Sequence, residues 1–123
     1  MGVSSHLKDN LIIFVLEGEN TVEQAKKAFA QIFSDESIDF PLPVLIDARH
    51  SCRNREMTEV AGFAEALLRF REKLGCKCAL VINEERQDPL GLERRLAAFS
   101  LRENIQFGLF FEIDSARTWL KQI

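Results

Sequence analysis

The sequence predicts an α/β fold with a mostly parallel sheet, because three short apolar runs are each followed by a longer amphipathic stretch. The runs begin at Val44, Ala79 and Gly108 and are rich in branched or aromatic residues. Buried parallel strands lose the alternation of half-exposed strands and need helical crossovers between them. We expect five strands, four helices and an N-terminal antiparallel hairpin, with a site where strands end and helices begin.

Length and composition predict one folded domain over residues 1–123. The chain is 46% hydrophobic and 28% charged, so one core can form without disulfides or metal. The longest uncharged apolar run, residues 11–16, is too short for a membrane span, and residues 1–10 lack a secretory signal. A cytoplasmic location is therefore expected. The net charge of −3 argues against nucleic-acid binding.

The N-terminal third predicts a hairpin followed by a helix. Residues 3–7 and 11–16 read as two strands around the polar turn at residues 8–10, with the short first strand at a sheet edge. Thr21 and Gln24 form a capping-box pattern, so a helix is expected to begin immediately after Thr21.

The middle of the chain predicts a strand, a polar loop and a long helix. Two prolines delay the strand until Val44, and the polar loop starts at Arg49. The helix is expected to continue through Lys73 and to be stopped by Gly75. A strand around Ala79 follows.

The C-terminal third predicts a helix, a strand and a short terminal helix. Asp88 is expected to cap the first helix, with Pro89 at its first position. The last strand covers residues 107–113, and Asp114 or Ser115 is expected to cap the terminal helix.

Short motifs spread over residues 10–120 resemble those of a known family. They are Glu17–Gly18–Glu19, Pro43 through Arg49, Asp88 through Arg94, and Phe110–Phe111–Glu112 followed by Ala116, Trp119 and Leu120. The chain resembles a single-domain bacterial relative of the sulfate transporter and anti-sigma-factor antagonist (STAS, SpoIIAA-like) domain. The resemblance implies a superhelix of strand–helix units. It also implies that the protein has no cofactor and is not an enzyme. It implies a binding or regulatory role toward proteins or small anionic or lipid-like ligands.

One departure from this family concerns phosphorylation. The regulatory antagonists carry a phosphorylated serine in an Asp-Ser-Ser-Gly-like helix start, whereas residues 52–59 here contain no serine. Only Ser51 or Thr58 remain as possible phospho-acceptors. This departure argues against kinase-coupled antagonism.

A cationic segment on this acidic chain is the main candidate site. The residues predicted to bind a ligand or partner are Arg49, His50, Ser51, Arg53, Arg55 and Thr58. Guanidinium groups beside a helix N-terminus bind anions, so a phosphate, a carboxylate or an acidic protein segment fits. The alternative is that these arginines are solvated and pair with Glu56 and Glu59, which contributes little to stability.

An enzymatic alternative rests on Cys52, whose thiol lies in the same cationic segment. Residues 45–49 also resemble a strand and loop of rhodanese-like sulfur-transfer domains. The catalytic cysteine of those domains follows a later strand, whereas here that strand ends at Asn83 and is followed by Glu84 and Glu85. This alternative is therefore ranked below the binding module.

The other cysteines predict core packing and no metal site. Cys76 and Cys78 lie two apart in an expected strand, so both thiols face one side. No Cys-x-x-Cys pair is present, and both histidines lie far from these cysteines in the sequence.

Acidic residues also gather at the predicted strand ends, at Asp47 and after the next strand at residues 84, 85 and 88. Paired carboxylates can share acid and base roles. Without a placed histidine or metal, we interpret them as solvated acids and a helix cap. The segment 84–91 is expected to lie beside the cationic segment.

Two phenylalanines of the long helix, Phe63 and Phe70, lie off its main apolar stripe. They either widen the buried face or form an exposed patch for a second subunit or an apolar ligand. A homodimer through this helix is one option. The alternative function is a carrier of a lipid-like molecule, with a cavity between helices and sheet.

Overall fold

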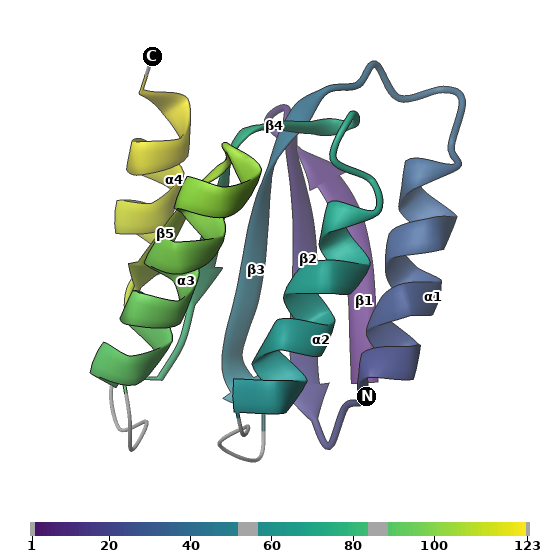
Figure 1. Cartoon of the computed structure of the whole chain (residues 1–123). Helices are drawn as coiled ribbons and strands as arrows, with labels where there is room; N and C mark the ends of the chain where they lie inside the picture. Colours follow the sequence, from purple (N-terminus) through teal and green to yellow (C-terminus); the bar gives the residue numbers. More distant parts are fainter. Residues whose placement is uncertain (1, 52–56, 84–88, 123) are drawn as a thin grey trace.

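After the hairpin of the first two strands, four helices alternate with three further strands in the described part of the chain (Figure 1). The computed structural model describes residues 2–51, 57–83 and 89–122. The strands are β1 (Gly2–Lys8), β2 (Leu11–Gly18), β3 (Leu42–Ser51), β4 (Leu74–Val81) and β5 (Gln106–Phe110). The helices are α1 (Val22–Phe33), α2 (Met57–Leu68), α3 (Pro89–Glu103) and α4 (Ile113–Lys121).

The strands lie in the sheet in the order β1-β2-β3-β4-β5. The β1–β2 pair is antiparallel, and each later strand pairs in parallel with the strand before it. The hairpin turn places Asp9 and Asn10 at φ 53° and 60°, a conformation that short polar side chains tolerate in tight hairpins. The predicted α/β fold, its N-terminal hairpin and the edge position of the first strand are confirmed.

The helices cover the two faces of the sheet unequally. Helices α1, α2 and α3 lie in front of the sheet in Figure 1 and share its larger core. Helix α4 packs on the other face, over a smaller core that includes Leu11, Leu45 and Val81. We call these the three-helix face and the α4 face.

Phenylalanine rings dominate the three-helix face. Phe14 meets Phe29 edge to face at 4.7 Å between ring centroids, and Phe33 stacks on Phe70 at 5.0 Å. Phe63 also packs against this core. Phe63 and Phe70 thus widen the buried face, which is the first of the two roles considered for them.

The first helix begins as its capping-box pattern predicts. The Gln24 backbone N–H donates to Thr21 Oγ1 at 3.2 Å, and Gln24 Oε1 accepts from the Thr21 N–H at 2.9 Å. Two N–H groups that the helix leaves unpaired are thereby satisfied.

The second helix ends at Leu68, so the prediction that it continues through Lys73 is wrong. After Leu68 the chain forms tighter turns, with backbone bonds such as Phe70 N to Leu67 O at 3.0 Å. Gly75 is not a helix stop but belongs to β4, where an added Cβ would lie 2.8 Å from the Pro43 nitrogen. Close approach of two strands is therefore the reason for this glycine.

The third strand is longer than predicted. It runs from Leu42 to Ser51, so the segment expected as a loop from Arg49 begins inside the strand. Its ladder to β4 is irregular between Leu42 and Val44, because Pro43 has no N–H to donate.

The termini of the later elements also differ from the prediction. The fourth strand ends at Val81 rather than at Asn83, and the fifth ends at Phe110. Helix α4 has Glu112 at its N-cap without a side-chain bond, so neither Asp114 nor Ser115 is the cap. Helix α3 begins at Pro89 as predicted, while Asp88 lies outside the described residues.

Candidate functional site

The parallel strands bring their C-terminal ends to one edge of the sheet, which we call the carboxyl edge (Figure 1). Strand β3 extends farthest here. It pairs with β4 only as far as Asp47, opposite Val81, but with β2 as far as Ser51, opposite Gly18. Residues 48–51 therefore lie beyond the last described pairing with β4.

A bidentate ion pair stands at the base of this extension. Asp47 is 8% exposed, and its two carboxylate oxygens accept from Arg49 Nε at 2.9 Å and Nη2 at 3.0 Å. The Arg49 backbone N–H also donates to Asp47 Oδ1 at 3.2 Å. Burial raises the pKa of the Asp47 carboxyl, but the bonds and charge of Arg49 outweigh this and hold the pKa below its ordinary value.

The pair fixes the direction of the Arg49 guanidinium. Two of its five N–H donors bind Asp47, and its side chain remains 33% exposed. The ion-pair partner found for Arg49 is thus Asp47, whereas Glu56 lies outside the described residues and the Glu59 side chain is not described. The pair is neutral as a unit, so this part of the edge is less cationic than the sequence indicates.

A buried amide fastens the end of β3 to the turn after β2. Asn20 is 1% exposed, and its Nδ2 donates to the Gly18 carbonyl oxygen and to Ser51 Oγ, both at 3.1 Å. A buried amide needs such partners to offset its desolvation. Asn20 therefore holds the β2 turn and the tip of β3 in one arrangement.

The structure brings together three of the six predicted site residues. Arg49, exposed His50 and half-buried Ser51 are consecutive at the tip of β3. Arg53 and Arg55 lie outside the described residues, and Thr58 lies in α2 with its side chain not described. Binding by these residues, and phosphorylation of Ser51 or Thr58, remain predictions.

Carboxylates share the edge with these residues. Glu17 lies opposite His50 in the β2–β3 ladder, and the charge of Glu112 acts on Arg49. The Asp47–Arg49 pair and the role of Asn20 were not predicted from the sequence. The first had a signal, because residues two apart on a strand point to the same face; the second had none.

The described thiol of the sheet is inert. Cys78 is 1% exposed in β4, and burial raises its pKa to about 12. This agrees with the core role predicted for it, while Cys52 and the Cys76 side chain are not described. Across residues 2–51, 57–83 and 89–122, no group of three His, Cys, Asp or Glu side chains could hold a metal ion.

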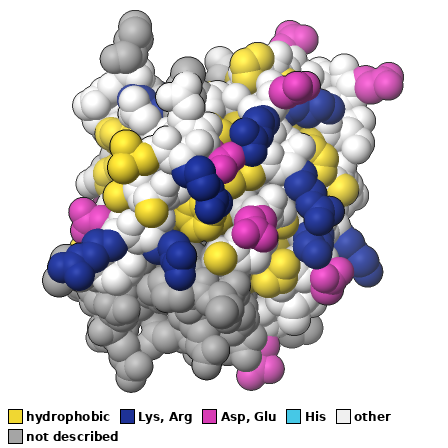
Figure 2. Space-filling model, viewed as in Figure 1, with side chains coloured by type: hydrophobic (Ala, Val, Ile, Leu, Met, Phe, Trp, Pro, Cys, Tyr) yellow, Lys and Arg dark blue, Asp and Glu magenta, His cyan; other side chains and the backbone are white. Residues whose placement is uncertain are grey.

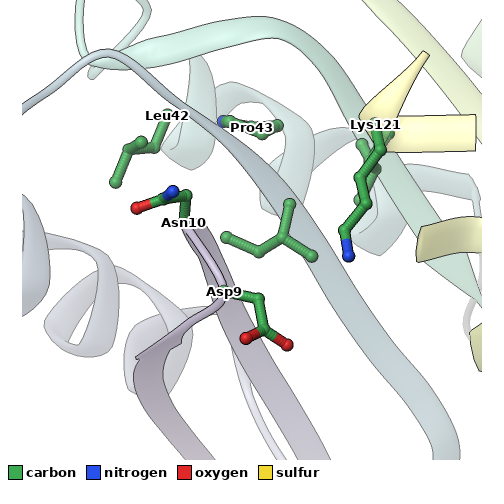
Figure 3. A pocket seen from close by; sticks show the side chains of 7 residues that line it. Asp9, Asn10, Leu42, Pro43 and Lys121 are labelled. Atoms are coloured by element: carbon green, nitrogen blue, oxygen red, sulfur yellow. The ribbon is translucent and has the colours of Figure 1, made fainter. Parts of the chain in front are cut away.

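A second feature lies at the opposite edge, beside the hairpin turn (Figure 3). It is an open hollow of about 650 Å³ between the start of β3 and the end of α4. The residues that line it are Asp9, Asn10, Leu11, Leu42, Pro43, Leu120 and Lys121. Four of these residues are apolar, and Asp9 and Lys121 are charged. The carrier alternative stays a prediction.

Comparison with known proteins shows the fold. The chain is similar to an uncharacterized protein of the DUF3478 family with a SpoIIAA-like fold from Shewanella loihica PV-4, with a TM-score of 0.67 and 18% identity. The match covers 97% of this chain and 94% of the other. No protein-family model matches the sequence, and no curated protein matches it. No helix among the described residues is long and apolar enough to cross a membrane.

Proposed function

We propose that this protein is a non-enzymatic binding or regulatory module that recognises a protein partner or a small anionic ligand at the carboxyl edge. The SpoIIAA-like fold supports a module of this kind. We place the recognition surface at the tip of β3 and the start of α2, with Arg49, His50 and Ser51 at its described part.

The fixed Arg49 guanidinium carries this proposal. Asp47 has already ordered the side chain, so binding a carboxylate or phosphate would cost less side-chain entropy than binding to a free arginine. The remaining N–H donors offer charge-assisted hydrogen bonds, which are the stronger kind. His50 is exposed next to Arg49, and its ring N–H can donate a further hydrogen bond to the anion.

The same contacts support a binding role over catalysis. Asp47 is held as an ionised carboxylate by Arg49, so it is a poor general base. Cys78 is buried and remains protonated at neutral pH. Asp47 is the described one of the carboxylates considered for acid–base roles, whereas the candidate nucleophile Cys52 lies outside the described residues.

A thermal-shift series tests the anion site. Sulfate or phosphate is expected to raise the Tm of the wild type, and the rise is expected to vanish in the variant His50→Ala, Arg53→Ala, Arg55→Ala. The matched control Lys27→Ala, Arg69→Ala removes cations from α1 and from the turn after α2, and it should keep the shift. Equal shifts in all three proteins would contradict an anion site at the carboxyl edge.

The hollow beside the hairpin turn favours a second candidate function, the carriage of a small amphiphile. Its volume is in the range of small-molecule sites, with an apolar floor and a charged rim. Native mass spectrometry of the purified protein, followed by titration with a fluorescent fatty acid, tests it. Saturable binding that Leu42→Glu abolishes would support carriage, and the absence of binding by the wild type would end it.

A further inference from the structure

The outward side of α3 carries an unusual combination of exposed apolar and cationic side chains. Its buried side is formed by Leu96 and Phe99, at 5% and 4% exposure. Its outward side is formed by Arg94, Arg95, Ala97, Ala98, Leu101 and Arg102, which we call the α3 outer face. Leu101 is 89% exposed, the highest value among the large hydrophobic side chains described.

These residues form three successive layers along the helix. Two arginines come first, two alanines follow one turn later, and Leu101 with Arg102 comes one turn after that. Figure 2 shows dark blue and yellow side chains next to one another over this part of the surface. Arg95 and Arg102 thus lie along one side of the apolar residues, and Arg94 is in line with Ala98 and Leu101. Exposed Glu93 lies on the other side, one turn before Ala97.

Among the described residues, the cations of this face are only partly paired with carboxylates. Within the described part of the chain, neither Arg94 nor Arg95 has an ion-pair partner. Arg102 lies over the Phe99 ring at 4.7 Å and donates to Glu103 at 2.9 Å, while Arg71 from the end of α2 binds the same carboxylate. One carboxylate therefore serves two guanidinium groups, which leaves a positive excess.

We infer that the α3 outer face is a docking surface for an acidic amphipathic helix of a partner protein. The alanines allow a second helix to approach closely, and Leu101 would pack against the apolar stripe of that helix. The arginines then select glutamate or aspartate beside that stripe. This surface and its partner are separate from the anion site proposed at the carboxyl edge.

Charge and shape argue against the other occupants of such a face. A second copy of this chain would bring Arg94, Arg95 and Arg102 against their own copies, and like charges in contact are destabilising. A lipid surface requires several large apolar side chains to insert, whereas this face presents one, Leu101, beside two alanines.

Fluorescence anisotropy with a synthetic peptide tests the inference. The probe is an amphipathic peptide of about 20 residues with leucine and alanine on one face and glutamate on both flanks. The wild type is expected to bind it, and both Leu101→Gln and the pair Arg94→Gln, Arg95→Gln are expected to weaken binding about tenfold. The pair should also reduce the salt dependence, and Lys27→Gln with Arg69→Gln should leave the affinity unchanged.

Four results would overturn the inference. They are no binding of the glutamate peptide by the wild type below about 1 mM, equal binding of a peptide with lysine flanks, unchanged binding by Leu101→Gln, and a Leu101-dependent dimer in light scattering. Sedimentation of the wild type, but not of Leu101→Gln, with phosphatidylglycerol vesicles would instead assign the face to a membrane. Circular dichroism confirms that each variant is folded.

Discussion

The two faces of the sheet are held by different kinds of contact. The three-helix face is packed with phenylalanine rings, and Phe33 alone meets the rings of Phe14, Phe40 and Phe70. The α4 face has a smaller aliphatic core, and polar contacts fasten its one helix: Lys77 binds the C-terminal end of α4, and Arg117 pairs with Asp9. A face with little apolar area thus depends more on specific polar contacts.

The largest expected effect compares one buried residue from each core. Phe33→Ala should lower the free energy of unfolding by about 4 kcal/mol, and Leu45→Ala on the α4 face by about 3 kcal/mol. The aromatic site loses more because three rings face the cavity. Urea denaturation measures both, and a larger loss for Leu45→Ala would reverse the ranking of the two cores.

The next effect concerns Asp47, which lies on the same strand face as Leu45. The pKa of its carboxyl is lowered on folding from the ordinary 3.8, so the unfolded chain binds more protons in this range. The stabilisation is complete above that ordinary value and is lost as the pH falls through the lowered pKa. Asp47→Asn should cost about 2 kcal/mol at neutral pH.

Denaturation at several pH values checks this prediction. The cost of Asp47→Asn should shrink as the pH falls below about 4. Asp35→Ser is the comparison variant outside the sheet. The pKa of the exposed Asp35 carboxyl is also lowered, because Ser37 donates hydrogen bonds to it. A cost for Asp47→Asn that is the same at pH 3 and pH 7 would show that shape, not charge, matters at this position.

A smaller effect is expected at the end of α4. Lys77 Nζ donates to the carbonyl oxygens of Trp119 at 2.9 Å and Gln122 at 2.8 Å, and lies over the Trp119 ring at 4.9 Å. Lys77→Met keeps the apolar stem but removes these bonds, so it should cost about 1 kcal/mol. Lys121→Met, in the last turn of α4, is the matched control with little expected change. Thermal denaturation with tryptophan fluorescence monitors both.

The smallest effect belongs to the ion pair between the hairpin turn and α4. Arg117 and Asp9 are partly exposed, so Arg117→Gln should cost about 0.5 kcal/mol and nothing measurable at about 1 M salt. If Arg117→Gln lowers the free energy of unfolding more than Lys77→Met does, the ion pair at the hairpin turn is the main polar contact that holds α4 on the sheet. The salt series separates charge from packing.

Much of the fold could be predicted because its signals are local. The hairpin turn, the capping box at Thr21 and the start of α3 at Pro89 each depend on a few neighbouring residues. The end of α2 could not, since residues after Leu68 leave the helix and Leu74 enters a strand that packs against Pro43. Tertiary contacts override helical periodicity there.

The candidate site was predicted only in part. The position of Arg49, His50 and Ser51 at a strand end follows from the parallel sheet. Their contacts do not, because Arg49 pairs with Asp47 within β3 and Ser51 binds Asn20 from another part of the chain. The sequence alternatives for Arg49 were an anion site or pairing with Glu56 and Glu59, whereas its pairing with Asp47 makes it a fixed hydrogen-bond donor.

The sheet places its strands in the order in which they are synthesised, which bears on how the chain folds. Each new strand adds beside the one that precedes it, so no strand waits for a distant segment before it can pair. Each parallel pair spans one helical crossover, as from Ile12 to Val44 and from Val44 to Cys78, so its loop closes at a lower entropy cost than a connection to a more distant strand. The chain is thus suited to fold from its N-terminal hairpin onward as it leaves the ribosome.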